Sequence, residues 1–130
     1  LQRGAVRVGV HEAFGGYAAA VACHDLYECL VETHPPDRFV SYVALFPDAR
    51  FDDEAAFERA LWDHLQAMHD VDRRHFAWDP EVASDPRDAK FSFSIGGRAW
   101  YVVGLHPRAS RLARRFTVPA LVFNPHAQFE

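Results

Sequence analysis

A histidine, a serine and several arginines follow one another closely in the last third of the chain. His106 stands where an expected strand gives way to a helix, and side chains at strand ends commonly face a cleft. An imidazole can ligate a metal ion or transfer a proton near neutral pH. Guanidinium groups bind carboxylates and phosphates through paired hydrogen bonds. The segment therefore predicts an anion or cofactor site made of His106, Arg108, Ser110, Arg111, Arg114 and Arg115.

Two interpretations of this basic segment stay open. Residues 108–116 have the spacing of a short helix on which the arginines share much of one side. Such a helix can hold an anionic ligand, with Ser110 as a cap or a further contact. Alternatively, it is a solvated surface that pairs with the acidic helix before it. Acidic residues concentrate between Asp48 and Asp88, and basic ones between Arg98 and Arg115, so both interpretations have the charges that they need.

A second polar group follows the last expected strand. Asn124 precedes Pro125 and His126, and Gln128 comes two residues later. His126 is a candidate metal ligand or general base, and Asn124 is a candidate cofactor contact. The alternative is an Asx turn with a partly exposed histidine.

Other histidines carry weaker patterns. His64 falls on the apolar stripe of a predicted helix, where a histidine is more often a core residue than a ligand. His69 with Asp70 and Asp72 has the ligand types for a divalent cation, but not the spacing of a known metal motif. No residue is singled out as catalytic.

The hydrophobic pattern predicts the elements that position these residues. Gly96-Gly97 supplies the tight turn of a hairpin, and Pro35-Pro36 ends the first helix. We expect strands over 5–10, 38–46, 91–95, 99–105 and 120–123, and helices over 17–33, 53–69 and 108–116. This order predicts a single α+β domain over residues 1–130, with a mainly antiparallel sheet and helices packed on it.

Composition narrows the class of protein. The chain has 130 residues and a formal net charge of -4, which argues against a general nucleic-acid binder. Cys23 and Cys29 form no CxxC pair or Cys/His quartet, so no zinc site is signalled, and free thiols fit the reducing cytoplasm. No apolar run approaches the length of a membrane span. The expected partners are a small molecule and a second copy of the chain.

Taken in order, the motifs resemble the YqcI/YcgG family. The similarity covers most of the chain and is strongest from Phe57 onward. Upstream it comprises Phe57-Glu58, Leu61-Trp62, His69-Asp70 and Phe76 through Trp78. Downstream it comprises Phe91 through Gly97, Val103 through Pro107, Ser110-Arg111, Arg114-Arg115-Phe116, Leu121 through His126 and Gln128-Phe129.

This resemblance implies an enzyme, because members of the family include haem-dependent monooxygenases that hydroxylate guanidino groups. One such reaction converts L-arginine to Nω-hydroxy-L-arginine in the biosynthesis of the antibiotic D-cycloserine. The resemblance implies a non-covalent haem b whose iron is held by His106 or, as second choice, His126. It implies that haem propionates or a substrate carboxylate contact Arg108, Ser110, Arg111, Arg114, Arg115 and Asn124. A guanidinium substrate also needs an acid, for which Glu130, Asp70 and Asp72 are candidates.

Two departures from the family pattern shape the alternatives. The family has a Pro-Cys-x-Phe-Ala-like block before the point where this chain begins, and further Arg- and acid-containing motifs after Glu130. We therefore expect the central part of a longer protein. The alternatives to the enzyme are a non-enzymatic haem- or anion-binding domain and a truncated, inactive module that dimerises.

Overall fold

Helices and strands alternate along the first half of the chain, and strands dominate the second. The computed structural model describes residues 3–32 and 38–126. The elements are β1 (Arg3–Val10), α1 (Gly16–Glu32), β2 (Arg38–Leu45), α2 (Glu54–Asp72), β3 (Phe93–Ile95), β4 (Arg98–Leu105), the 3-10 turn η1 (Leu112–Arg114) and β5 (Ala120–Pro125). The predicted α+β class is confirmed.

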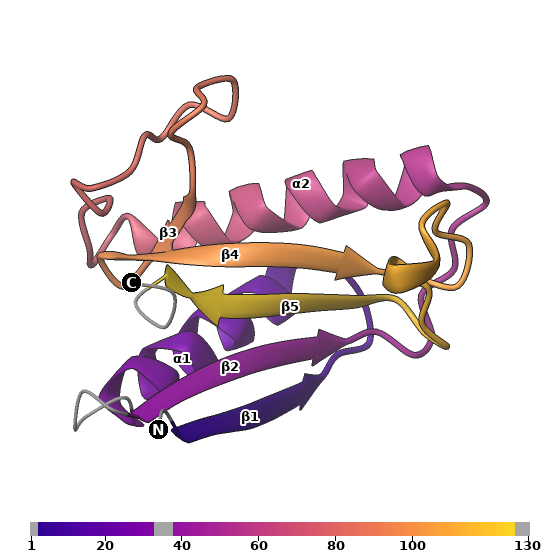
Figure 1. Ribbon diagram of the computed structural model, residues 1–130, viewed down its shortest axis with the longest axis horizontal. Helices are drawn as coiled ribbons and strands as arrows, with labels where there is room; N and C mark the ends of the chain where they lie inside the picture. The colour runs from indigo at the N-terminus through magenta and orange to yellow at the C-terminus, as the bar shows by residue number, and fades with distance from the viewer. Residues whose placement is uncertain (1–2, 33–37, 127–130) are drawn as a thin grey trace.

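The strands form one sheet in the order β1-β2-β5-β4-β3. β1 and β2 are parallel and are joined through α1, whereas the pairings β2–β5, β5–β4 and β4–β3 are antiparallel. Both helices pack on one face of this sheet, behind the strands in Figure 1. The mainly antiparallel sheet is thus confirmed, with one parallel pair at its β1 edge.

The second helix starts and ends at side-chain contacts. The Asp53 carboxylate caps its start by accepting the backbone N–H of Ala56 at 2.8 Å. The helix continues to Asp72, whose buried carboxylate accepts the Tyr27 hydroxyl at 2.7 Å and the Gly96 N–H at 2.9 Å. Asp72 therefore ties the end of α2 to α1 and to the β3–β4 turn.

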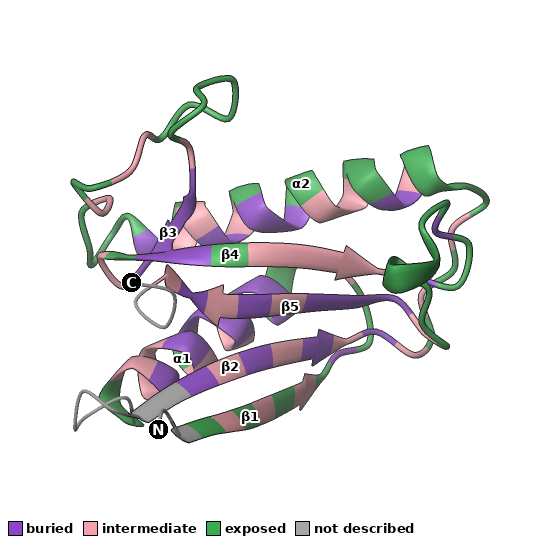
Figure 2. Cartoon of the chain, in the orientation of Figure 1, coloured by how far each residue is buried: buried purple, intermediate pink, exposed green. Residues whose placement is uncertain are grey.

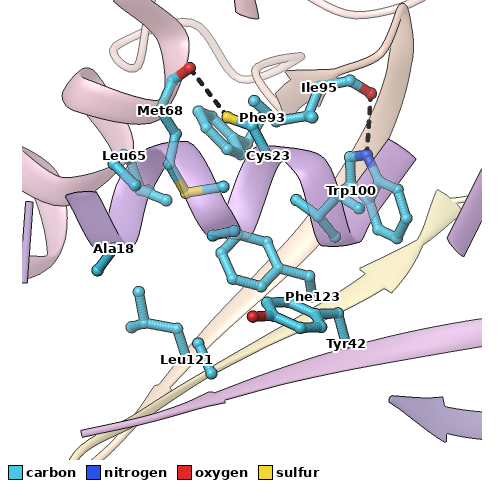
Figure 3. Close-up of a cluster of buried hydrophobic side chains, with 14 of the residues drawn as sticks. Ala18, Cys23, Tyr42, Leu65, Met68, Phe93, Ile95, Trp100, Leu121 and Phe123 are labelled. Carbon is cyan, nitrogen blue, oxygen red and sulfur yellow. Dashed lines mark hydrogen bonds between the residues drawn. The ribbon is translucent and has the colours of Figure 1, made fainter. Parts of the chain in front are cut away.

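The core fills the space between the helices and the sheet (Figure 3). Its largest fully buried side chains include Trp100, Tyr42, Phe46, Phe123, Leu26 and Met68. Each such side chain contributes about 1.5–3 kcal/mol through burial.

Both cysteines belong to this core as free thiols. The Cys23 thiol donates to the Met68 carbonyl at 3.3 Å. Burial raises the pKa of Cys23 to about 12 and that of Cys29 to about 11, so both stay protonated at neutral pH. Within the described residues, no helix is long and apolar enough to cross a bilayer.

The predicted helix over 108–116 is wrong. Only Leu112–Arg114 forms a 3-10 turn, and the rest of the segment is an irregular loop. The loop closes on His106, whose N–H donates to the Arg114 carbonyl at 3.1 Å and whose carbonyl accepts the Phe116 N–H at 3.3 Å. A short helix is costly to nucleate, and the Phe116 N–H, which such a helix would have used, donates to His106 instead.

Smaller differences concern strand lengths. The hairpin strand predicted from Phe91 is regular only over β3, because Phe91 makes an isolated bridge to Ala83 instead. The last strand extends to Pro125, so Asn124 lies within β5 and not in an Asx turn.

Candidate ligand-binding groove

A groove of about 320 Å³ lies between α2 and the loop that follows β4. Glu54, Glu58 and Trp62 line one side, and their four-residue spacing puts them on one face of α2. The sheet contributes Val102, Gly104 and His106, which alternate along β4 and beyond its end, and the loop contributes Ala109, Ser110, Arg111 and Arg114. Ionic groups of both signs therefore surround a partly apolar floor.

Gly104 lets the helix lie close to the strand. A Cβ atom at this position would come within 2.7 Å of Leu61 Cδ1 and 2.8 Å of Phe57 Cε2. The Phe57 ring in turn stacks on the His106 ring, with centroids 4.4 Å apart and planes at 25°. The absent side chain thus permits the packing that buries His106.

His106 lies at the buried end of the groove, with only 3% of its surface exposed. Its Nδ1 accepts the Arg108 backbone N–H at 3.3 Å. An imidazole nitrogen that accepts a hydrogen bond carries no proton, so the neutral ring has its proton on Nε2. Within the described chain, Nε2 is buried without a hydrogen-bond partner, and it lies 3.9 Å from Glu54 Oε2.

The Glu54 carboxylate occupies the anion-binding groups of the loop. Oε2 accepts the Ser110 N–H at 2.8 Å, and Oε1 accepts the Ser110 hydroxyl at 3.0 Å. These two hydrogen bonds, with a smaller effect from the charge of Arg114, hold the pKa of Glu54 below its usual value. The anion that Ser110 binds in the structure is therefore a side chain of the same protein, and its expected contact with a cofactor or substrate stays a prediction.

The predicted arginine cluster is divided between two roles. Arg111 and Arg114 line the groove together with Ser110. Arg108 instead donates to the Asp52 carbonyl at 2.9 Å, and Arg115 donates to the Ala109 carbonyl at 2.8 Å. Two of the arginines thus face the groove, while the other two hold the loop in place.

His126 and Asn124 lie at the opposite end of the strands. β4 and β5 are antiparallel, with Leu105 beside Ala120 and Trp100 beside Pro125. The rise per residue separates His106 from His126 by roughly 20 Å. The two histidines therefore cannot ligate one metal ion together.

The ring of His126 already has close partners. Its Nε2 lies 2.7 Å from Ser92 Oγ, and the ring stacks on Tyr101 with centroids 3.8 Å apart. The Ser92 hydroxyl donates to the Trp100 carbonyl at 3.0 Å, so Ser92 is placed to accept the His126 proton. Asn124 accepts the Ser41 hydroxyl at 2.7 Å, away from the arginines.

His64 is a core residue, as its place on the apolar stripe favoured. Its Nδ1 accepts the Gly15 N–H at 2.7 Å, and its ring packs edge-on against Phe14 and Phe46. Burial lowers its pKa to about 4, so the ring is neutral at physiological pH.

The acids expected to hold a guanidinium group lie away from the groove. Asp72 is buried in its contacts with Tyr27 and Gly96, and Asp70 is exposed and accepts the Gln66 amide at 3.1 Å. Glu130 lies outside the described residues. Sequence reasoning missed Glu54, Glu58 and Trp62, although their i, i+4, i+8 spacing was a readable signal.

A second, apolar groove of about 210 Å³ continues from the first. The two share Leu61, Trp62 and Val102. The second groove reaches Ser92 and Tyr101, the residues that contact His126. An elongated surface therefore runs along β4 from the ionic end to the His126 end.

Three side chains on α1 are of the types that ligate metal ions, but their partner in the structure is an arginine. Ligand atoms of His24, Asp25 and Glu28 lie within 4.8 Å of one another. Arg7 lies 3.5 Å from Asp25 and 3.0 Å from Glu28, so a guanidinium already neutralises these carboxylates. The cluster is therefore an ion-pair network between β1 and α1.

The sheet, its two helices and the flanking groove define an α+β domain. Comparison with known protein families identifies the family of the chain. The chain matches the YqcI/YcgG family over residues 1–130 and belongs to that family. No curated protein and no solved structure matches it.

Proposed function

We propose that this protein takes part in the haem-dependent N-hydroxylation of a guanidino compound, with L-arginine as the leading substrate. Two observations support the proposal: membership of the YqcI/YcgG family, and a groove whose two sides carry opposite charges. The second observation carries it, because a guanidino amino acid is a zwitterion with an anionic and a planar cationic end. The natural setting that we propose is natural-product biosynthesis in the cytoplasm, where the two buried thiols stay reduced.

Glu58 and Trp62 suit the cationic end of such a substrate. They lie one helical turn apart and both line the groove, and the Trp62 side chain is 42% exposed. A carboxylate pairs with a guanidinium through charge-assisted hydrogen bonds. An indole face adds a cation–π contact with the planar group. Glu54 is less available for this role because Ser110 already binds it.

Arg111 and Arg114 suit the anionic end. They line the groove on the loop side, opposite the helix, and guanidinium forks bind carboxylates with two parallel hydrogen bonds. A volume of about 320 Å³ lies at the lower end of small-molecule sites, which suits an amino acid. The protein would thus orient the substrate by the substrate's two charged ends and place the guanidino nitrogens next to the Trp62 ring.

The contacts of the two candidate imidazoles do not fit a haem ligand as they stand. An iron ligand must offer an unprotonated nitrogen. The His106 proton is on Nε2, beside Glu54, and His126 Nε2 is engaged with Ser92. His106 needs the smaller rearrangement to become an iron ligand. Its Nε2 has no hydrogen-bond partner in the described chain, and the hydrogen bond to its Nδ1 is long at 3.3 Å. Haem, when bound, would supply the oxidising chemistry.

A hemin titration followed by absorption spectroscopy tests the cofactor. We expect a Soret shift that His106→Ala removes and that His126→Ala keeps. The reverse result would transfer the ligand role to His126, and the absence of any shift would contradict haem binding by this chain.

Turnover is tested by mass spectrometry with L-arginine and hydrogen peroxide. In this reaction one guanidino N–H and one H₂O₂ give one N–OH and one water, so no further reductant is needed. We expect Nω-hydroxy-L-arginine with the haem-loaded protein and none with the haem-free one. Arginine or haem binding without product would instead support the non-enzymatic binding domain.

Arginine binding to the haem-free protein tests the groove by itself, using calorimetry. Glu58→Gln and Trp62→Leu should each weaken binding about tenfold or more. Glu81→Gln removes an exposed charge that lines neither groove and should bind arginine like the parent protein. Equal affinities for all four proteins would contradict the assigned roles.

A further inference from the structure

The first strand carries its three valines on the face away from the helices. Val6, Val8 and Val10 are 66%, 55% and 68% exposed. Arg7, which points to the other face, reaches α1 and lies 3.0 Å from Glu28. A strand with one solvated face normally turns its polar residues outward and its apolar ones to the core. In β1 the three valines point outward instead, and the helix side holds Ala5, Arg7 and Gly9, so the domain's own core does not account for these valines.

The valines of β1 begin a row that crosses the sheet. Val8 pairs with Val43, Val43 with Val122, and Val122 with Val103. Directly paired residues point to the same face of a sheet, so four valines from four strands stand side by side. A second row beside it holds Val10, Leu45, Ala120 and Leu105, of which Ala120 is fully buried.

A third row completes the surface, which we call the valine face. It holds Val6, Ser41, Asn124 and Tyr101, in which the Ser41 hydroxyl donates to Asn124. The three rows contain no charged residue, although 25% of the chain is charged. In Figure 2 the strands lie in front of the helices, and β1 alternates between exposed and intermediate residues. A flat apolar patch of this kind typically marks an interaction site.

We propose that the valine face binds the valine face of a second copy of this chain. The lack of charged residues on the valine face favours this partner. A charged partner finds no counter-charge among the described residues of this face, and its own charges would lose their hydration without compensation. Two copies, each with a net charge of -4, repel through most of their surfaces. An uncharged face lets them meet without pairing like charges.

The shape of the face also suits a two-fold dimer. In such a dimer the same patch serves both subunits, so a flat sheet surface is complementary to its own copy. Two sheets pack face to face about 10 Å apart, with strands crossing at about 30°, and short branched side chains interlock between them. The groove lies between α2 and the loop after β4 and includes the helix-side residues Val102 and Gly104. Dimerisation would therefore leave this first groove open, whereas Tyr101, which also lines the second groove, would lie in the interface. The inference stands independently of the proposed function.

Sedimentation velocity over a range of protein concentrations tests the dimer. The parent protein should sediment as a species of twice the 14.8 kDa chain mass. Val8→Lys adds a charge at a position that is 55% exposed in the single chain and should yield the monomer. Tyr17→Lys adds the same charge on α1, where the side chain is 85% exposed, and should remain dimeric.

A second variant guards against loss of folding. Val8→Thr keeps the branched shape that strands favour and exchanges a methyl group for a hydroxyl. It should fold, as judged by circular dichroism, and raise the dimer dissociation constant several-fold. A monomeric parent protein would overturn the proposal. So would a folded Val8→Lys or Val8→Thr variant that dimerises as tightly as the parent.

Discussion

Glu54 and Ser110 are 56 positions apart in the chain, yet the carboxylate of Glu54 accepts both the backbone N–H and the hydroxyl of Ser110. This contact joins the first turn of α2 to the loop after β4 and so forms one end of the groove. It also places Glu54 Oε2 3.9 Å from His106 Nε2. The loop, the helix and the buried histidine are therefore linked through one carboxylate.

The link between Glu54 and Ser110 should depend on pH in a defined direction. The folded-state pKa of Glu54 is lowered from 4.5 by its hydrogen bonds to Ser110. The contact is therefore complete above pH 4.5 and is lost as the pH falls through the lowered value. The Ser110 amide chemical shift, followed by NMR, should titrate in this range. Glu54→Gln should abolish that titration, and Glu58→Gln, one turn away, should preserve it.

Gly104→Ala should destabilise the protein and disturb the groove. The added methyl group meets Leu61 and Phe57 at distances below 3 Å, and overpacking of this kind costs about 1–3 kcal/mol. Urea unfolding measures the loss. Gly4→Ala is the matched control, because nothing lies within 4 Å of a Cβ atom there. Equal stability of the two variants would show that α2 moves away at no cost.

Asp72→Ala should also lower the free energy of unfolding. The substitution leaves the Tyr27 hydroxyl and the Gly96 N–H without their acceptor, and an unsatisfied buried donor costs about 1–3 kcal/mol. Asp70→Ala, an exposed change in the same helical turn, should cost much less. Thermal or urea unfolding compares the two, and similar losses would contradict the structural role of Asp72.

His64 should make stability fall in mild acid. Its pKa is lowered from 6.5 in the unfolded chain to about 4 in the fold. Between these values the unfolded state binds the extra proton, so the unfolding free energy decreases by up to about 1.4 kcal/mol per pH unit as the pH falls. His64→Gln, which can still accept the Gly15 N–H, should flatten this slope. The exposed control His24→Gln should keep this slope. An unchanged slope in His64→Gln would show that another group causes the loss of stability in acid.

Sequence periodicity predicted most of the fold because long amphipathic segments carry a strong signal. The stripe Phe57, Leu61, Leu65 and Met68 located α2, and Gly96-Gly97 located the β3–β4 turn. The segment 108–116 was misjudged because arginine spacing alone resembles a helix. Its actual conformation depends on hydrogen bonds to His106 and on the reach of Glu54 from another element.

The candidate site was predicted only in part, for a similar reason. Arg111, Arg114, Ser110 and His106 were identified from their types, and they do lie together at one groove. His126 and Asn124 have equally suitable chemistry, but the antiparallel pairing of β4 and β5 carries them to the far end. Residue type does not reveal which strand ends meet.

The sequence by itself determined the α+β class, the positions of its main elements and the kinds of chemistry present. These depend on local periodicity and on side-chain type, which a chain carries in any conformation. The tertiary structure alone decided that Glu58 and Trp62 face Arg111 and Arg114, that Asp72 is structural, and that the valines of four strands share one open face. Each of these depends on strand register and helix docking, which bring together residues that are distant in the sequence.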